Sequence, residues 1–155
     1  MVWPPDSPWA PWWRTTNIKA RVGLKLAEVT KDDLVYDLGC GDGRVVILAA
    51  KEFGAKGVGV EIDPLRFFLA NFLVRKNKVS KKVKITRGNF FEQDLSKATV
   101  VFLYLVPKAL KKLKQKLLKE LKPNCRIVTY KYKIDLPLVK NLKEDNLYLY
   151  KLPKS

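Results

Sequence analysis

The sequence predicts an α/β fold in which helices cover both faces of a mostly parallel sheet. Three observations carry this prediction. Apolar runs typical of buried strands alternate with helical segments along the chain. The run at residues 34–38 leads directly into a glycine-rich turn, and the next run, residues 58–62, carries the acid Glu61 near its end. Strands that alternate with helices are joined most simply by crossovers, which make neighbouring strands parallel.

The elements follow in a regular order. We expect a helix over about residues 17–29, where Ile18, Val22, Leu24, Leu26 and Val29 recur. Two more helices begin at prolines, at position 64 and at position 107, and the second ends near residue 122. Strands are expected over residues 34–38, 58–62, 83–86, 99–105 and 126–133, and a last alternating segment spans residues 146–152.

The whole chain, residues 1–155, is expected to form one domain. A chain of this size buries roughly two-thirds of its unfolded surface, enough for one core. Residues 1–16 differ from the rest, because they hold all four tryptophans and four of the nine prolines. We expect them to form an arm rather than a helix, and residues 17–155 to form the α/β core.

Composition excludes several kinds of chemistry. Histidine is absent, which removes imidazole bases, Ser/His and Cys/His nucleophile pairs and histidine-containing zinc sites. Cys40 and Cys125 belong to no CxxC pair, so we expect two packing thiols of a reducing compartment and no metal. No secretion signal or bilayer-spanning run is visible, which indicates a cytoplasmic protein without membrane contact.

The charge is strongly basic. A net charge of +16 favours contact with polyanions and opposes self-association, so we expect a monomer. The cofactor end is locally acidic, because Asp37, Asp42, Glu61 and Asp63 all fall near the glycine turn. Abundant lysine and glutamate without histidine is also typical of a heat-stable protein.

The turn lies within VYDLGCGDGR, residues 35–44, and contains Gly39, Gly41 and Gly43. It falls at the carboxyl edge of the sheet, where open α/β folds bind ligands. Glycines let a ligand approach the backbone, and free amides at the start of the next helix favour a carboxylate or phosphate. A tight turn accounts for one such glycine, so three of them indicate a bound ligand.

The spacing argues against two common nucleotide sites. The dinucleotide pattern G-x-G-x-x-G requires glycine where this chain has Arg44, and a P-loop requires a G-K-[ST] triplet that is missing. Glu61 instead follows the turn by about 20 residues, where an acid can accept hydrogen bonds from both ribose hydroxyls of a nucleoside. A solvated strand-end acid is the alternative, and Asp63 fits a helix N-cap better than a ligand.

From about residue 34 to residue 133 the chain resembles the class I S-adenosylmethionine-dependent methyltransferases. VYDLGCGDGR is similar to their first motif, VGVEID to their ribose-binding strand end and GNFFEQDL to their adenine-contacting loop. The resemblance implies a Rossmann-like fold with a seven-stranded type of sheet, a short C-terminal part and S-adenosyl-L-methionine as cofactor.

The resemblance also assigns cofactor-binding residues. It implies that Asp37 and the backbone of Gly39 and Gly41 hold the methionine part of the cofactor, with Cys40 and Asp42 in the same turn, and that Thr15 and Thr16 lie near the methionine carboxylate. It implies that Glu61 holds the ribose. It also implies that Ile62 packs on the adenine, and that Asn89 and the amide of Phe90 bind the adenine edge. Two of these residues have another interpretation. Asp42 fits a cap of the following helix equally well, and Asn89 fits a turn residue after Gly88.

The segment TVVFLYLVP, residues 99–107, faces the transferring methyl group in this family. Enzymes that methylate base amines commonly place [DN]-PP-[YF] there, whereas this chain has YLVP. With the proline-bearing arm, this is similar to the small archaeal protein-lysine methyltransferases of broad specificity. Those are related to the mitochondrial enzymes that methylate lysine in the ATP synthase c subunit and the adenine nucleotide translocase. The similarity implies lysine-bearing protein substrates, including this chain itself and basic chromatin proteins.

The predicted acceptor site consists of Tyr104, Trp12 and Trp13. Methyl transfer depends mainly on alignment and exclusion of water. Aromatic rings can hold the amine by cation–π contacts, and partial desolvation lowers the lysine pKa from about 10.4. Trp12 and Trp13, taken singly, fit hydrophobic anchoring of the arm better.

Two other functions stay open. An RNA methyltransferase would use the basic helix at residues 108–122 on phosphates, and a noncatalytic module would bind nucleic acid with the same face. A lysine-rich helix face is also typical of a solvated surface.

Overall fold

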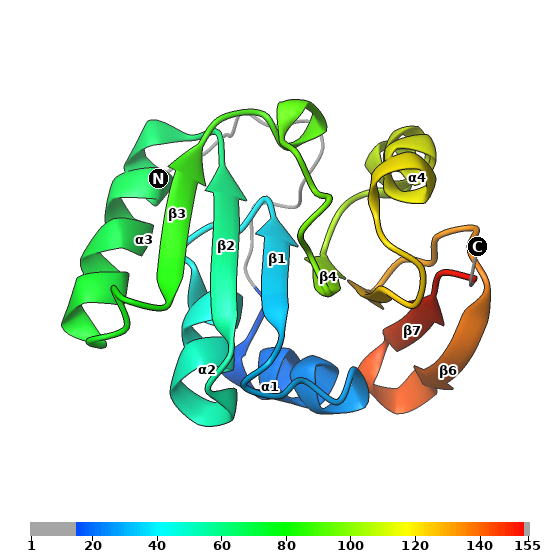
Figure 1. Ribbon diagram of the computed structural model, residues 1–155, viewed down its shortest axis with the longest axis horizontal. Helices are drawn as coiled ribbons and strands as arrows, with labels where there is room; N and C mark the ends of the chain where they lie inside the picture. The colour runs from blue at the N-terminus through cyan, green and yellow to red at the C-terminus, as the bar shows by residue number, and fades with distance from the viewer. Residues whose placement is uncertain (1–14, 154–155) are drawn as a thin grey trace.

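The computed structural model describes residues 15–153. Within this range seven strands form one sheet in the order β3-β2-β1-β4-β5-β7-β6, as Figure 1 shows. The strands are β1 (Leu34–Leu38), β2 (Lys56–Glu61), β3 (Val83–Arg87), β4 (Val100–Leu103), β5 (Arg126–Tyr130), β6 (Leu138–Leu142) and β7 (Leu147–Lys151). Strands β1 to β5 pair in parallel, and β7 is antiparallel to both of its neighbours. The predicted mostly parallel seven-stranded sheet is confirmed.

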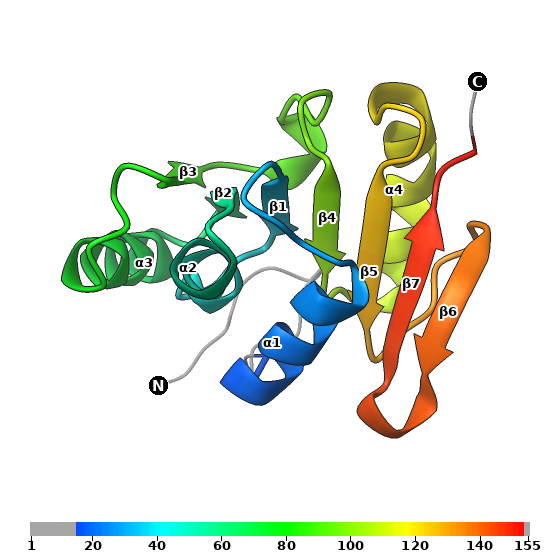
Figure 2. The same cartoon turned by 60° about the horizontal axis from the view of Figure 1, so that its bottom comes forward.

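Helices cover both faces of the sheet, as predicted. The helices are α1 (Asn17–Leu26), α2 (Arg44–Phe53), α3 (Pro64–Lys76) and α4 (Pro107–Glu120), with short 3-10 turns η1 (Phe90–Glu92) and η2 (Lys143–Asp145). Helices α1, α2 and α3 pack on one face and α4 packs on the other, as Figure 2 shows. None of the helices within residues 15–153 is long and apolar enough to cross a membrane.

Several boundaries differ from the sequence-based expectation. Helix α1 ends at Leu26 instead of about residue 29, because Ala27 caps it and Glu28 adopts a φ of 56°. Strand β2 begins two residues early, and β4 and β5 end early. Strand β6 was not expected at all. Its residues are exposed or half-buried, so it shows little of the apolar pattern that marks a buried strand.

Two glycines of β2 bring helix α2 close to the sheet. A Cβ added at Gly57 would lie 2.8 Å from the Cβ of Val46, and one added at Gly59 would lie 2.7 Å from the sulfur of Cys40. Any side chain at either position would push α2 or the preceding turn away from the sheet. The glycines therefore fix where the turn between β1 and α2 sits above β2.

Candidate functional site

The candidate site lies at the carboxyl edge of β1, β2 and β4. Strand β1 stands between β2 and β4, so the chain goes to one side of β1 first and to the other side later. Such a reversal of strand order leaves a crevice outside the carboxyl ends of the strands, where ligands bind in open α/β sheets. The predicted site residues at β1, β2 and β3 lie near the carboxyl ends of these strands or in the turns that follow them, at this edge of the sheet.

The glycine turn after β1 has a left-handed backbone at each alternate position. The φ angles of Gly39, Gly41 and Gly43 are 79°, 59° and 82°, a region that side chains disfavour. The prediction that a turn accounts for only one of these glycines is therefore wrong. Gly41 still leaves room for a ligand, because a Cβ built there would have nothing within 4 Å.

The backbone amides of this turn donate hydrogen bonds within the protein. Those of Gly39 and Cys40 bind the carbonyl of Val60 at 2.8 and 2.9 Å, and that of Gly43 binds Cys40 at 2.9 Å. The Gly41 amide binds Glu61 at 2.8 Å. These four amides are therefore already bonded within the protein. The expectation of free amides concerned the start of α2, where the first amide, that of Arg44, donates to Asp42 at 3.2 Å.

Glu61 joins the turn after β1 to the turn after β2. One carboxylate oxygen accepts from the Gly41 amide at 2.8 Å and the other from the Asp63 amide at 2.9 Å. The side chain is buried, and this burial raises its pKa although the two amides act in the opposite direction. Each oxygen keeps a lone pair for a further donor. The alternative of a solvated strand-end acid is excluded.

Two more buried acids stand near Glu61. Burial, followed by the charges of Glu61 and Asp42, raises the pKa of Asp37 to about 8. No residue within 15–153 donates a hydrogen bond to the Asp37 carboxyl group, whereas Asp42 accepts from the Arg44 amide at 3.2 Å and from its guanidinium at 2.9 Å. Asp42 thus bonds the first amide of α2, whereas the N-cap of that helix is Gly43, which makes no side-chain cap bond. Asp37 is a buried acid that a cationic ligand would stabilise.

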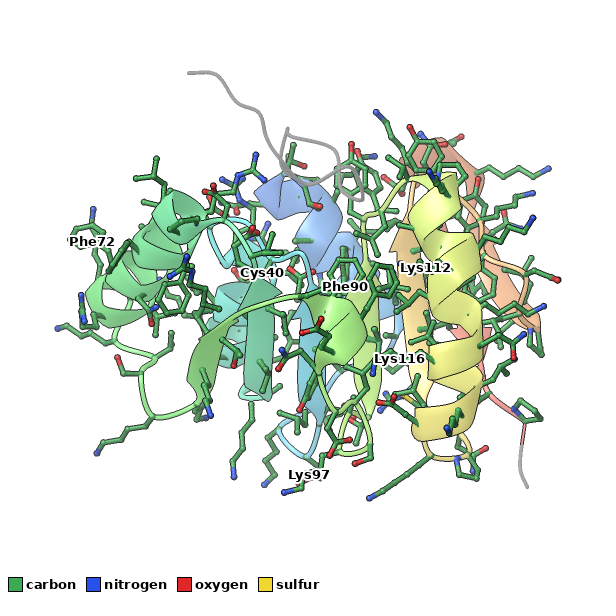
Figure 3. All side chains as sticks on the ribbon, turned by 90° about the horizontal axis from the view of Figure 1, so that it is seen from above. Cys40, Phe72, Phe90, Lys97, Lys112 and Lys116 are labelled. Carbon is green, nitrogen blue, oxygen red and sulfur yellow. The ribbon has the colours of Figure 1, made fainter. Side chains whose placement is uncertain are left out.

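The loop after β3 is fastened to the end of β2. The Gly88 amide donates to the Glu61 carbonyl at 3.0 Å. Asn89 caps η1 by accepting from the Phe91 amide at 2.9 Å, which is the turn role considered for it. Phe90 is buried, and Figure 3 labels it beside the sheet. Ile62 is 49% exposed, so its side chain is open to an incoming ring.

Tyr104, at the end of β4, packs against Tyr130 at the end of β5. Their ring centroids are 4.8 Å apart with an interplanar angle of 60°, and Tyr104 is buried. Tyr130 was missed from the sequence. It lies 26 residues after Tyr104, and only the adjacency of β4 and β5 brings the two rings together. An aromatic pair at this edge can hold a cation.

The remaining predicted residues lie near these elements or outside them. Thr16 caps α1 by accepting from the Lys19 amide at 3.2 Å, and Thr15 is buried. Cys40 packs in a buried cluster with Val46 and neighbours, so its thiol serves packing. Trp12 and Trp13 lie outside the described residues. Among residues 15–153 no group of three or more Cys, Asp and Glu side chains could hold a metal ion.

Comparisons with known proteins agree with this geometry. Residues 37–139 match the model of the ANTKMT methyltransferase domain. A protein-lysine N-methyltransferase from Saccharolobus islandicus is 46% identical over 135 residues, covering 86% of this chain and 82% of that protein. The lysine N-methyltransferase of the ATP synthase c subunit from Xenopus laevis is 28% identical over 79% of this chain, which spans 53% of that protein.

A solved structure is similar over nearly the whole chain. The crystal structure of an RNA methyltransferase from Salinibacter ruber, in complex with S-adenosyl-L-homocysteine, has a TM-score of 0.87 and 37% identity. It covers 92% of this chain and 95% of that chain. The resemblance inferred from the motifs and the cofactor that it implied are confirmed. The chain belongs to the ANTKMT methyltransferase domain family and is an S-adenosylmethionine-dependent methyltransferase.

Proposed function

We propose that the protein methylates the side-chain amine of lysine in proteins, with a broad range of substrates. The observation that carries this is the 46% identity to a protein-lysine N-methyltransferase over most of both chains. The absence of histidine agrees with it, because transfer from a sulfonium requires alignment of the amine and exclusion of water more than a dedicated base.

The buried acids would hold the cofactor, which supplies a methyl group on a sulfonium when bound. Asp37 would accept the ammonium of the methionine part together with the carbonyls of Gly39 and Gly41. Glu61 would accept both ribose hydroxyls on the lone pairs that its two backbone partners leave free. Thr15 and Thr16 stay candidates for the methionine carboxylate, since the amides of the glycine turn are engaged.

The adenine would lie between the ends of β2 and β3. Ile62, about half exposed, would cover one ring face. The Asn89 oxygen already accepts from Phe91 and retains one lone pair for the exocyclic amine. The amide of Phe90 would donate to the neighbouring ring nitrogen.

The acceptor lysine would enter beside Tyr104 and Tyr130. Two aromatic rings can hold a lysine ammonium, and partial desolvation of the site lowers the lysine pKa, so that the amine loses its proton more easily. Tyr104 would orient the free amine toward the methyl group. The participation of Trp12 and Trp13, the cytoplasmic location and the monomeric state stay predictions.

Labelled S-adenosylmethionine tests the acceptor class. The protein is incubated with the labelled cofactor and a cell extract, and the products are digested with protease or with nuclease. Label that protease releases, recovered as methyllysine by mass spectrometry, supports the proposal. The Asp37→Asn variant serves as the control, because it should lose label with every substrate.

RNA is the second candidate substrate. It is favoured by the similarity to the Salinibacter ruber RNA methyltransferase, which is 37% identical to this chain, and by the exposed lysines 108, 111, 112 and 119 of α4. In the same experiment, label released by nuclease and retained after protease would establish this function instead.

A further inference from the structure

Helix α3 exposes large apolar side chains along one face. Leu65, Phe68, Leu69 and Phe72 are 70%, 67%, 38% and 54% exposed. Their spacing of three and four residues places them on one side of the helix. Figure 3 shows Phe72 on the side of α3 that faces away from the sheet, at the end of the molecule. We call these four residues the α3 outer face.

The fold does not need this face. The opposite side of α3 packs on the sheet through Ala70 and Val74, with Phe67 and Leu73 partly buried beside them. A surface helix normally presents polar residues to solvent. Exposed apolar side chains that gather in one patch mark a surface that binds something.

The chain that includes the α3 outer face is mostly basic, and the nearest acid before it in sequence is Asp63, which caps the N-terminus of α3. Residues 64–91 contain no Asp or Glu, and their eight basic residues are Arg66, Arg75, Lys76, Lys78, Lys81, Lys82, Lys84 and Arg87. All but Arg66 are exposed. An apolar helix face with cationic residues around it matches a surface that is apolar inside and anionic at its rim.

We propose that the α3 outer face docks on an anionic lipid bilayer. Aromatic and aliphatic side chains of such a helix enter the boundary between headgroups and acyl chains, while Lys and Arg bind anionic headgroups. A second copy of the chain would bring another basic surface and a net charge of +16 against this one. A single-stranded nucleic acid could stack bases on Phe68 and Phe72, but it would leave the exposed Leu65 and Leu69 in water.

This docking is peripheral and is independent of which substrate is methylated. The sequence-based expectation of no membrane contact rested on the lack of a spanning segment, which a helix lying on the bilayer does not need. Helix α3 begins at Pro64, three residues after Glu61. The bilayer-facing helix therefore starts at the cofactor edge, so docking would place the cofactor site close to the membrane surface.

Vesicle cosedimentation tests the proposal. The full chain should bind vesicles of mixed phosphatidylglycerol and phosphatidylcholine and not vesicles of phosphatidylcholine alone. The double variant Phe68→Ser/Phe72→Ser should bind about tenfold more weakly. The control is Leu118→Ser, which changes a 41% exposed apolar residue on the lysine-rich helix α4 and should bind as the wild type does. Unchanged cofactor affinity in each variant shows that it is folded.

A dye that reports polarity locates the contact. Cys40 and Cys125 are buried, so Phe72→Cys and Leu118→Cys can each be labelled at one site. A blue shift with anionic vesicles at position 72 and none at 118 supports the proposal. Failure of the wild type to bind, or equal binding by the double variant, overturns it. A blue shift at position 72 without vesicles also overturns it. If raising the protein concentration is enough to cause that shift, the face binds a second copy of the chain, and if soluble polyglutamate is enough, it binds an acidic protein.

Discussion

Replacing Glu61 with alanine should destabilise the protein even without cofactor. The variant leaves the amides of Gly41 and Asp63 without the acceptors that they meet at 2.8 and 2.9 Å. A hydrogen bond to a charged group contributes roughly 1.5–3 kcal/mol. The burial that raises the pKa of Glu61 offsets part of this, so we expect the free energy of unfolding to fall by about 2–4 kcal/mol.

Urea unfolding followed by far-ultraviolet circular dichroism measures this loss. For a chain of this size it corresponds to a melting temperature lower by roughly 4–16 °C. The Glu61→Gln variant should lose nearly as much free energy of unfolding, because the side-chain nitrogen of glutamine would face one of the two backbone donors. The matched control is Glu144→Ala, an exposed acid of η2, which should change the free energy of unfolding by less than about 0.5 kcal/mol. If Glu61→Ala were as stable as this control, the structural role of Glu61 would be refuted.

Three further predictions concern the site and its support. Burial raises the pKa of Asp37 to about 8, so the protein without cofactor holds a proton on this carboxyl group at neutral pH. A bound ammonium would displace that proton. Calorimetry between about pH 5.5 and 7 should therefore show the cofactor affinity rising with pH, by up to about tenfold per pH unit. Asp37→Asn should bind more weakly with no such slope, and a slope that persists in it would assign the proton elsewhere. Tyr104→Phe should lower kcat at least several-fold and leave the cofactor Kd unchanged; a changed Kd with normal kcat would contradict its place beside the acceptor. Gly59→Ala should lower the free energy of unfolding by about 1–3 kcal/mol, because the new Cβ would lie 2.7 Å from the sulfur of Cys40. Combining it with Cys40→Ala should restore part of the loss, and purely additive effects would show that the two residues do not clash.

The parallel part of the fold could be predicted because its signals are local. Buried strands β1, β2 and β4 are short apolar runs, and Pro64 with the Asp63 cap marks the start of α3, where the Asp63 carboxylate does accept from Arg66. Strand β6 could not be predicted in the same way. It lies at the sheet edge and carries exposed Leu138 and Val139, so no alternation of buried and exposed residues distinguishes it from a loop.

The site was predicted in its parts but not in its connections. The sequence indicated that Glu61 matters, because an acid ends the second strand after a glycine turn. It could not indicate that Glu61 binds the Gly41 amide, because that contact depends on how closely the turn before α2 approaches β2. The pairing of Tyr104 with Tyr130 likewise depends on strand order, which no local pattern specifies.

The bridge that Glu61 makes between two turns has a consequence for how the cofactor arrives. Pulling those turns apart would break the bond between Glu61 and the Gly41 amide together with the bonds from the Gly39 and Cys40 amides to Val60, so this side of the crevice keeps its form when empty. Encounter with the nucleoside half of the cofactor then needs no folding of either loop, and its rate should depend on diffusion and on the charge of the approaching molecule.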